Sequence, residues 1–189
     1  MRGRIIVAIT GASGSPIAVK LIDTLLEKGY TVGLIASENG NKVMRFETGY
    51  GIERYSDIEN ITIYDNNDLG ADISSGTSRF EAMIIVPCST STLAKINCGI
   101  ADNLITRAAV VAIKEKIDLI LVPRESPLSP IILRNMKELA DVGVNIIPPM
   151  MEFYTKPETI DDLISFTVGR ILDSLGIEHG LYRKWTGKE

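Results

Sequence analysis

Short apolar runs alternate along the chain with longer segments in which apolar residues recur every three or four positions. Unbroken apolar runs are typical of strands covered on both faces, and the recurring pattern is typical of amphipathic helices. The predicted strands are 5–9, 31–36, 61–64, 82–86, 119–122 and 145–147, and the predicted helices are 16–28, 38–48, 90–96, 103–116, 130–142 and 160–175. This alternation predicts one doubly wound α/β domain, Rossmann-like or flavodoxin-like, with helices on both faces of a parallel sheet.

The polar segment 56–79 is the part of the chain whose structure is hardest to predict. It is broken by Gly70 and Gly76 and contains only one short strand-like run. The pattern elsewhere has no repeats, low-complexity stretches or linkers, so all 189 residues are expected to form a single domain.

Composition narrows the class of protein. Hydrophobic residues make up 45% of the chain, and the net charge of −4 gives no indication of nucleic-acid binding. No apolar run reaches the roughly 18 residues of a membrane helix. The N-terminus has no signal-peptide pattern, so a cytoplasmic protein is expected.

Cysteine and histidine usage argues against a metal site. Cys88 and Cys98 have neither metal-ligand nor redox-motif spacing, and both are expected to be free, buried thiols. The single histidine, His179, lies near the C-terminus, which disfavours a serine–histidine triad or a histidine-rich metal site.

The first loop, Gly11-Ala12-Ser13-Gly14-Ser15, follows the first predicted strand. Glycine lets backbone N–H groups approach a ligand, and the next helix N-terminus favours anions; a tight turn needed only for packing would look similar. The loop is not G-x-G-x-x-G, and Ser37 stands where a dinucleotide site needs an acidic residue. No Walker loop is present, so a mononucleotide phosphate fits best.

A second hydroxyl-rich loop, Ser89-Thr90-Ser91-Thr92, follows the strand at 82–86. Helix capping would need only one of these four hydroxyls, whereas a phosphate could use several. If the strands 5–9 and 82–86 are neighbours, both loops lie at one site.

Basic residues supply the remaining candidate groups. Arg107 and Lys114 are two helical turns apart on one face, which is either a solvated face or part of a site. Arg124 and Glu125 directly follow the strand at 119–122, where catalytic groups lie in this fold class; a structural ion pair is the alternative.

Three residues near the C-terminus also stand out. Arg170 is embedded in an apolar helix stretch and needs a carboxylate or an anionic ligand as its partner. Tyr154 follows the rigid Pro148-Pro149 pair, which could present it to a pocket. Trp185 could anchor against this subunit or a neighbour, and the tail, about 176–189, is expected to pack on a neighbouring subunit.

Distinctive short motifs occur in a fixed order over nearly the whole chain. They are Gly11-Ala12-Ser13-Gly14, Ser37, Phe46-Glu47-Thr48, Ile73-Ser74-Ser75-Gly76, Pro87-Cys88-Ser89-Thr90, Asn103-Leu104-Ile105-Thr106-Arg107-Ala108-Ala109, Val122-Pro123-Arg124-Glu125, Pro148-Pro149-Met150, Phe153-Tyr154, Gly169-Arg170-Ile171-Leu172 and Arg183-Lys184-Trp185. This ordered set resembles the UbiX family of flavin prenyltransferases.

The resemblance implies an activity. Members of that family transfer a dimethylallyl group from dimethylallyl phosphate to N5 and C6 of reduced FMN, without a metal. The prenylated FMN serves UbiD-type decarboxylases, and the enzymes form dodecamers with active sites at subunit junctions.

The resemblance also implies roles for individual residues. The expected FMN ligands are Gly11, Ala12, Ser13, Ser37, Ser89, Thr90, Ser91, Thr92 and Arg124. The expected prenyl-phosphate ligands are Arg107, Lys114, Arg124, Tyr154, Arg170 and Trp185. The expected catalytic residues are Glu125, Glu47, Ser13 and Lys114, with Glu125 moving the proton at ring closure.

The chain has Pro16-Ile17-Ala18 where many relatives have a tyrosine and a glycine, and Val110 where many have an aspartate. These departures concern local packing, since neither position is among the expected site residues. Two other functions stay open. A cysteine-type decarboxylase would share the fold and FMN, but it needs a histidine in the body of the domain. A non-catalytic flavin carrier or decarboxylase accessory subunit would not need Glu47, Lys114 and Glu125.

Overall fold

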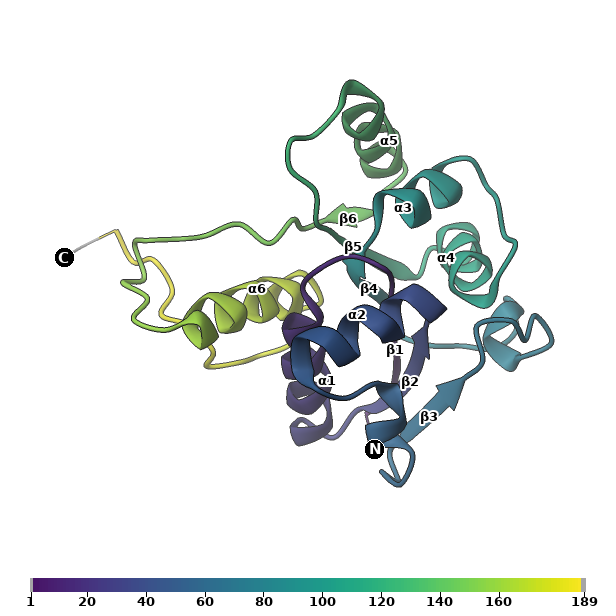
Figure 1. Ribbon diagram of the computed structural model, residues 1–189, viewed down its shortest axis with the longest axis horizontal. Coiled ribbons are helices and arrows are strands. Elements are labelled where there is room, and N and C mark those ends of the chain that lie inside the picture. Colours follow the sequence, from purple (N-terminus) through teal and green to yellow (C-terminus); the bar gives the residue numbers. More distant parts are fainter. Residues whose placement is uncertain (1, 188–189) are drawn as a thin grey trace.

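A computed structural model describes residues 2–187, and its centre is a parallel sheet of six strands (Figure 1). The strand order is β3-β2-β1-β4-β5-β6. The strands are β1 Arg4–Ile9, β2 Thr31–Ala36, β3 Ile61–Tyr64, β4 Ala82–Cys88, β5 Asp118–Pro123 and β6 Asn145–Ile146. Strand β1 pairs in parallel with both β2 and β4, which confirms the expected doubly wound fold.

Helices connect these strands at nearly the positions that the apolar pattern predicts. They are α1 Ser15–Glu27, α2 Glu38–Thr48, α3 Thr90–Asn97, α4 Leu104–Glu115, α5 Pro130–Asp141 and α6 Ile160–Ser174. Pro16 lies in the first turn of α1, where its missing N–H removes no helical hydrogen bond. Each predicted end lies within two residues of the observed one, as expected for helices and strands that fray at their ends.

Two hydrophobic cores lie on opposite faces of the sheet. Along β1, Ile5 and Val7 enter the core formed with α1, α2 and α6, whereas Ile6 and Ala8 enter the core formed with α3, α4 and α5. All four side chains are almost completely buried. This two-sided burial explains why residues 5–9 of β1 are apolar at every position rather than at alternate ones.

The polar segment between β3 and β4 is held in place by distant side chains. It contains a short 3₁₀ helix, η2 Asp72–Ser74, and another, η1 Ile52–Tyr55, precedes β3. Arg4 donates to Asp72 Oδ2 at 2.8 Å and to Tyr64 Oη at 2.9 Å. Local sequence pattern cannot reveal such an element, because its anchor lies more than sixty residues away.

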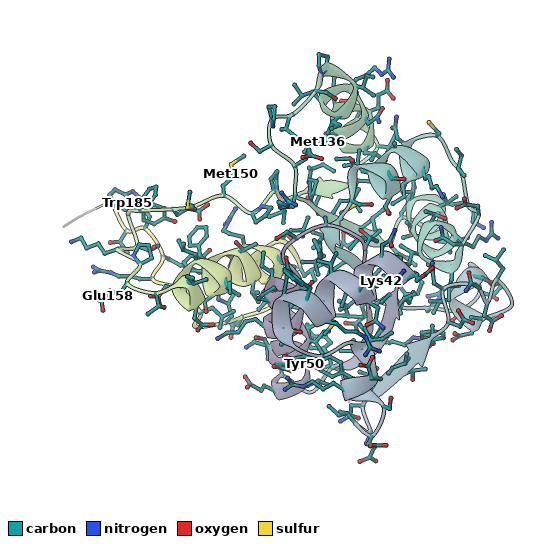
Figure 2. The ribbon with its side chains drawn as sticks, viewed as in Figure 1. Lys42, Tyr50, Met136, Met150, Glu158 and Trp185 are labelled. Carbon is teal, nitrogen blue, oxygen red and sulfur yellow. The ribbon has the colours of Figure 1, made fainter. Side chains whose placement is uncertain are left out.

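An arm projects from the domain beyond the last strand (Figure 1). We define the arm as residues 148–159, helix α6 and residues 176–187. The connection 148–159 leads away from β6, and the C-terminal segment returns along α6. Figure 2 shows Met150, Glu158 and Trp185 on this arm. Met150 and Trp185 are both about two-thirds exposed, at 64% and 67%.

Candidate functional site

Most of the candidate residues lie at the carboxyl ends of four adjacent strands, β2, β1, β4 and β5. The strand order reverses between β1 and β4, which makes the gap between their carboxyl ends the switch point where such sheets bind ligands. The loop at 11–14 follows β1, and residues 89–92, expected as a loop, are the N-cap and first turn of α3, directly after β4. Because β1 and β4 are hydrogen-bonded neighbours, these two segments lie side by side at adjacent strand ends, as the expected pairing requires.

Thr10 ties the two loops together. Its hydroxyl donates to the Pro87 carbonyl at 2.9 Å and accepts from the Ser89 backbone N–H at 2.7 Å. Thr10 is 2% exposed, so this bridge is part of the core beneath the site. Thr10 belongs to none of the candidate motifs, and the only signal in the sequence is a polar residue directly after the apolar run 5–9.

The N-termini of three helices face the same edge of the sheet, because α1, α2 and α3 begin just after β1, β2 and β4. Ser37 caps α2 by accepting from the Gly40 N–H at 3.0 Å, and Ser89 caps α3 by accepting from the Thr92 N–H at 3.2 Å. Three positive helix ends favour an anion at this edge.

Close packing holds α2 at this position. A Cβ atom on Gly40 would lie 2.3 Å from the Ile9 carbonyl oxygen at the end of β1. Only glycine therefore allows the first turn of α2 to approach the strand this closely. The glycine fixes where the Ser37 cap and its helix end lie.

Glu47, on α2, accepts hydrogen bonds from the end of the first loop. Helix α1 has Gly14 as its N-cap residue and no side-chain cap of its own. Glu47 Oε2 accepts from the Ser15 N–H at 2.8 Å and from the Gly14 N–H at 3.1 Å. The structure thus brings the predicted catalytic pair Glu47 and Ser13 together, with Glu47 capping α1.

Hydrogen bonding determines the charge of Glu47. Burial acts to raise the pKa of this carboxyl, but hydrogen bonds from the Ser13 hydroxyl and the Ser15 and Gly14 N–H groups outweigh it. The pKa therefore lies below its ordinary value, and Glu47 is ionised at neutral pH.

Arg124 and Glu125 leave β5 at the same edge, and both are exposed. Glu125 Oε1 accepts from the Ser126 N–H at 3.0 Å. The ion pairs found within residues 2–187 do not include one between Arg124 and Glu125. The alternative interpretation, a structural ion pair between these two residues, is therefore not observed, and both charged groups can contact a ligand.

Arg170 lines a cavity of about 440 Å³ between β6 and α6. Its guanidinium lies 3.4 Å from Asp173 Oδ2, so the expected carboxylate partner is present. Glu152 lines the same cavity, and its buried Oε2 has no hydrogen-bond partner in the described part of the chain. Burial raises the pKa of Glu152, and the nearby charge of Arg170 partly opposes the rise.

Tyr154 and Trp185 meet at the outer part of the arm. Their rings pack edge to face with centroids 5.7 Å apart, and Tyr154 also packs against Phe166 of α6 at 6.0 Å. The tail is thus anchored on its own subunit, while the indole of Trp185 stays largely exposed.

Arg107 and Lys114 lie on α4, apart from the loops. Arg107 Nε donates to the Ser74 carbonyl at 2.9 Å, and Lys114 pairs with its neighbour Glu115 at 2.9 Å. The end of α4 leads into the amino end of β5, which begins at Asp118. Lys114 is therefore near the opposite edge of the sheet from the loops of its own chain.

Two sequence interpretations need correction or refinement. Cys88 is buried as expected, but Cys98 is exposed, because it lies at the C-terminal cap of α3 rather than on its apolar face. His179 is not an isolated tail residue: its side chain is 1% exposed and contacts Asp173. Within residues 2–187 no group of three or more potential ligands could hold a metal, and no helix is long and apolar enough to cross a bilayer.

The fold and the phosphate-favouring edge define a class, a mononucleotide-binding flavoprotein, and a family model named Flavoprotein matches residues 2–172. Among curated proteins, flavin prenyltransferase UbiX of Thermoplasma acidophilum is 46% identical over 96% of this chain and 99% of its own length. The chain belongs to the UbiX family of flavin prenyltransferases.

Solved structures agree with this membership. The crystal structure of AnUbiX in complex with FMN and dimethylallyl pyrophosphate matches with a TM-score of 0.95 and 40% identity over all of both chains. The dodecameric FMN-dependent UbiX-like decarboxylase of Escherichia coli O157:H7 matches with a TM-score of 0.93 and 42% identity, over 97% of this chain and 100% of that one.

The cysteine-type decarboxylases are more distant. The peptidyl-cysteine decarboxylase EpiD has a TM-score of 0.61 and 20% identity over 80% of this chain and 84% of that one. That likeness shows a shared fold and nothing further.

Proposed function

We propose that this chain transfers a dimethylallyl group from dimethylallyl phosphate to N5 and C6 of reduced FMN, and that the prenylated FMN serves UbiD-type decarboxylases. The main supporting observation is that two hydroxyl-rich segments, three helix N-termini and the Arg124–Glu125 pair lie at one edge of the sheet. The whole-chain match to a relative that holds FMN and a prenyl diphosphate supports it independently.

The FMN phosphate is proposed to bind between the N-termini of α2 and α3, near Ser37 and Ser89–Thr92. The end of α1 is less suitable, because the carboxylate of Glu47 already accepts from its first N–H groups. At α2 and α3 the capping side chains are neutral hydroxyls, and Glu38, the acid in the first turn of α2, is paired with Lys42. Gly11, Ala12, Ser13 and Arg124 would then border the flavin ring.

The cations are proposed to bind the prenyl phosphate. When the carbon–oxygen bond breaks, its electron pair leaves with the phosphate, and fixed positive charges stabilise the charge that develops. Arg124 and Arg170 are the candidates within one chain, with Tyr154 and Trp185 covering the site. Glu125 would accept the proton lost at ring closure.

Arg107 and Lys114 are proposed to act in the site of a neighbouring subunit within a dodecamer. The supporting observation is the position of Lys114 near the amino edge of the sheet, away from the loops of its own chain. Co-expressing two inactive variants, Lys114→Ala and Glu125→Gln, with different tags would test this. Mixed oligomers should recover turnover if each variant supplies what the other lacks, and inactive mixtures would contradict the arrangement.

The central experiment mixes the protein, without oxygen, with reduced FMN and either dimethylallyl phosphate or dimethylallyl pyrophosphate. Mass spectrometry should detect FMN enlarged by one prenyl group. Decarboxylation of a cysteine-terminated peptide instead would favour the cysteine-type enzymes. Bound FMN without any product from either donor would favour a flavin carrier.

A further inference from the structure

Asp173, on the last turn of α6, accepts from four side chains. His179 Nε2 lies 3.2 Å and Lys184 Nζ 3.3 Å from Oδ1, while Tyr182 Oη and Arg170 Nη1 donate to Oδ2, the latter at 3.4 Å. Three of these donors belong to the C-terminal segment, and the fourth is the cation that lines the cavity against β6. One carboxylate therefore joins the tail to Arg170.

The tail is fitted closely to α6 at this point. A Cβ atom on Gly169 would lie 2.5 Å from the Tyr182 ring and 2.7 Å from the His179 ring. Glycine thus lets both rings lie against the helix. The Phe166 and Tyr182 rings also pack with centroids 4.5 Å apart.

The histidine has a defined role in the cluster. His179 Nδ1 accepts from the Leu181 backbone N–H at 3.2 Å, so this nitrogen carries no proton. In this arrangement Nε2 is the nitrogen that donates to Asp173 Oδ1. Burial opposes ionisation of Asp173, but the bonds from Tyr182, His179 and Lys184 outweigh it and lower its pKa.

We propose that Asp173 is a positioning residue, which locks the C-terminal segment to α6 and so holds Arg170, Tyr154 and Trp185 as one unit at the prenyl-phosphate side of the site. The inference rests on the proposed function for the role of Arg170. The contact to Arg170 is the longest of the four, and so it is the one that a phosphate can most readily replace. The three tail contacts can then remain in place.

Asp173→Asn is a sharp test, because all four partners are donors. An asparagine has one acceptor oxygen, and its NH₂ group must face two donors whichever way it is turned. Tyr182→Phe removes one hydroxyl and keeps the ring against Gly169. Asp141→Asn is the control: Asp141 is an exposed acid of α5 paired with Lys137, on the opposite face of the sheet.

The first readout does not depend on turnover. Trp185 is the only tryptophan of the chain, so quenching of its fluorescence by acrylamide reports how the tail is held. In Asp173→Asn the emission should shift and the quenching constant should rise, with a smaller change in Tyr182→Phe and none in the control. Unchanged Trp185 signals in Asp173→Asn, in protein with an unchanged circular dichroism spectrum, would overturn the proposal.

The second readout separates positioning from general folding. With reduced FMN, the KM for dimethylallyl phosphate should rise about tenfold in Asp173→Asn, as expected for a lost charge-assisted arrangement, while FMN affinity stays within about twofold. An equal loss of affinity for both ligands would contradict positioning and indicate a structural role alone. If wild-type protein forms no product, the proposed function fails, whereas the fluorescence result still decides whether Asp173 holds the tail.

Discussion

Glu47→Gln tests whether a side chain from α2 holds the first loop. The carboxylate accepts from the Ser15 and Gly14 N–H groups, and α1 has no cap of its own. A glutamine keeps one acceptor oxygen, but its NH₂ group replaces Oε1, which lies 3.3 Å from the Gly14 nitrogen. The substitution also removes the negative charge at the helix end. Losing a helix cap typically costs about 0.5–2 kcal/mol, and bonds to a charged group lie in the upper half of that range. We therefore expect a loss of about 1–2 kcal/mol in the free energy of unfolding.

For a chain of this size, such a loss lowers the melting temperature by about 2–8 °C. The assay is thermal unfolding followed by circular dichroism at matched protein concentrations, since assembly itself shifts the apparent stability. Glu38→Gln is the control, because Glu38 is an exposed acid that pairs only with Lys42 among the contacts found here. Glu38 also lies in the first turn of a helix, but it is exposed, so its replacement should lower the melting temperature less than Glu47→Gln does.

The same variant has a defined pH dependence. The pKa of Glu47 is lowered by folding, so its stabilising contribution is complete above the ordinary pKa of 4.5 and is lost as pH falls through the folded-state pKa. The gap between wild type and Glu47→Gln should thus be constant from pH 7 to pH 5 and should shrink below pH 4.5. A gap of the same size at pH 7 and pH 3, or no gap at pH 7, would refute the reasoning.

Three further changes have expected outcomes. Glu125→Gln should bind both substrates yet lower the rate of ring closure by about 10²–10⁴-fold in rapid-quench mass spectrometry, and wild-type turnover would exclude it as the proton acceptor. Gly40→Ala should destabilise the fold by about 1–3 kcal/mol in chemical denaturation, since its Cβ would lie 2.3 Å from the Ile9 carbonyl, whereas Gly180→Ala, with no atom within 4 Å, should be nearly neutral. Arg107→Ala should weaken dimethylallyl phosphate binding about tenfold in titration calorimetry and leave FMN binding nearly unchanged.

The fold could be predicted from the sequence because the strands are buried on both faces. A run of apolar residues at every position, as in residues 5–9 of β1 and in β4, indicates a covered strand in a chain of this pattern. The short helices η1 and η2 could not be predicted. Arg4 holds η2 through Asp72, and Asn41 of α2 accepts from the Ile52 N–H of η1, so neither element depends on a local hydrophobic period.

The candidate site could be predicted in part. The loops after β1 and β4 came together because sequence order and parallel pairing place both at the same edge. The cap that Glu47 gives α1 could not be predicted, since its partner Gly14 lies 33 residues away. The link from Arg170 through Asp173 to the tail could not be predicted either. The hydrophobic period of α6 does not show which segment of the chain packs against that helix.

Glu47 and Glu125 differ in how readily each can accept a proton, because their hydrogen bonds differ. Glu47 accepts from two backbone N–H groups and the Ser13 hydroxyl, and these bonds lower its pKa and its tendency to accept a proton. Protonating it would also weaken its bonds to the N-terminus of α1 and loosen the first loop. Glu125 is exposed and accepts from the N–H of the next residue, Ser126, so it can take a proton without disturbing a helix end. The geometry therefore favours Glu125 as the proton acceptor and Glu47 as the group that fixes the loop and orients Ser13.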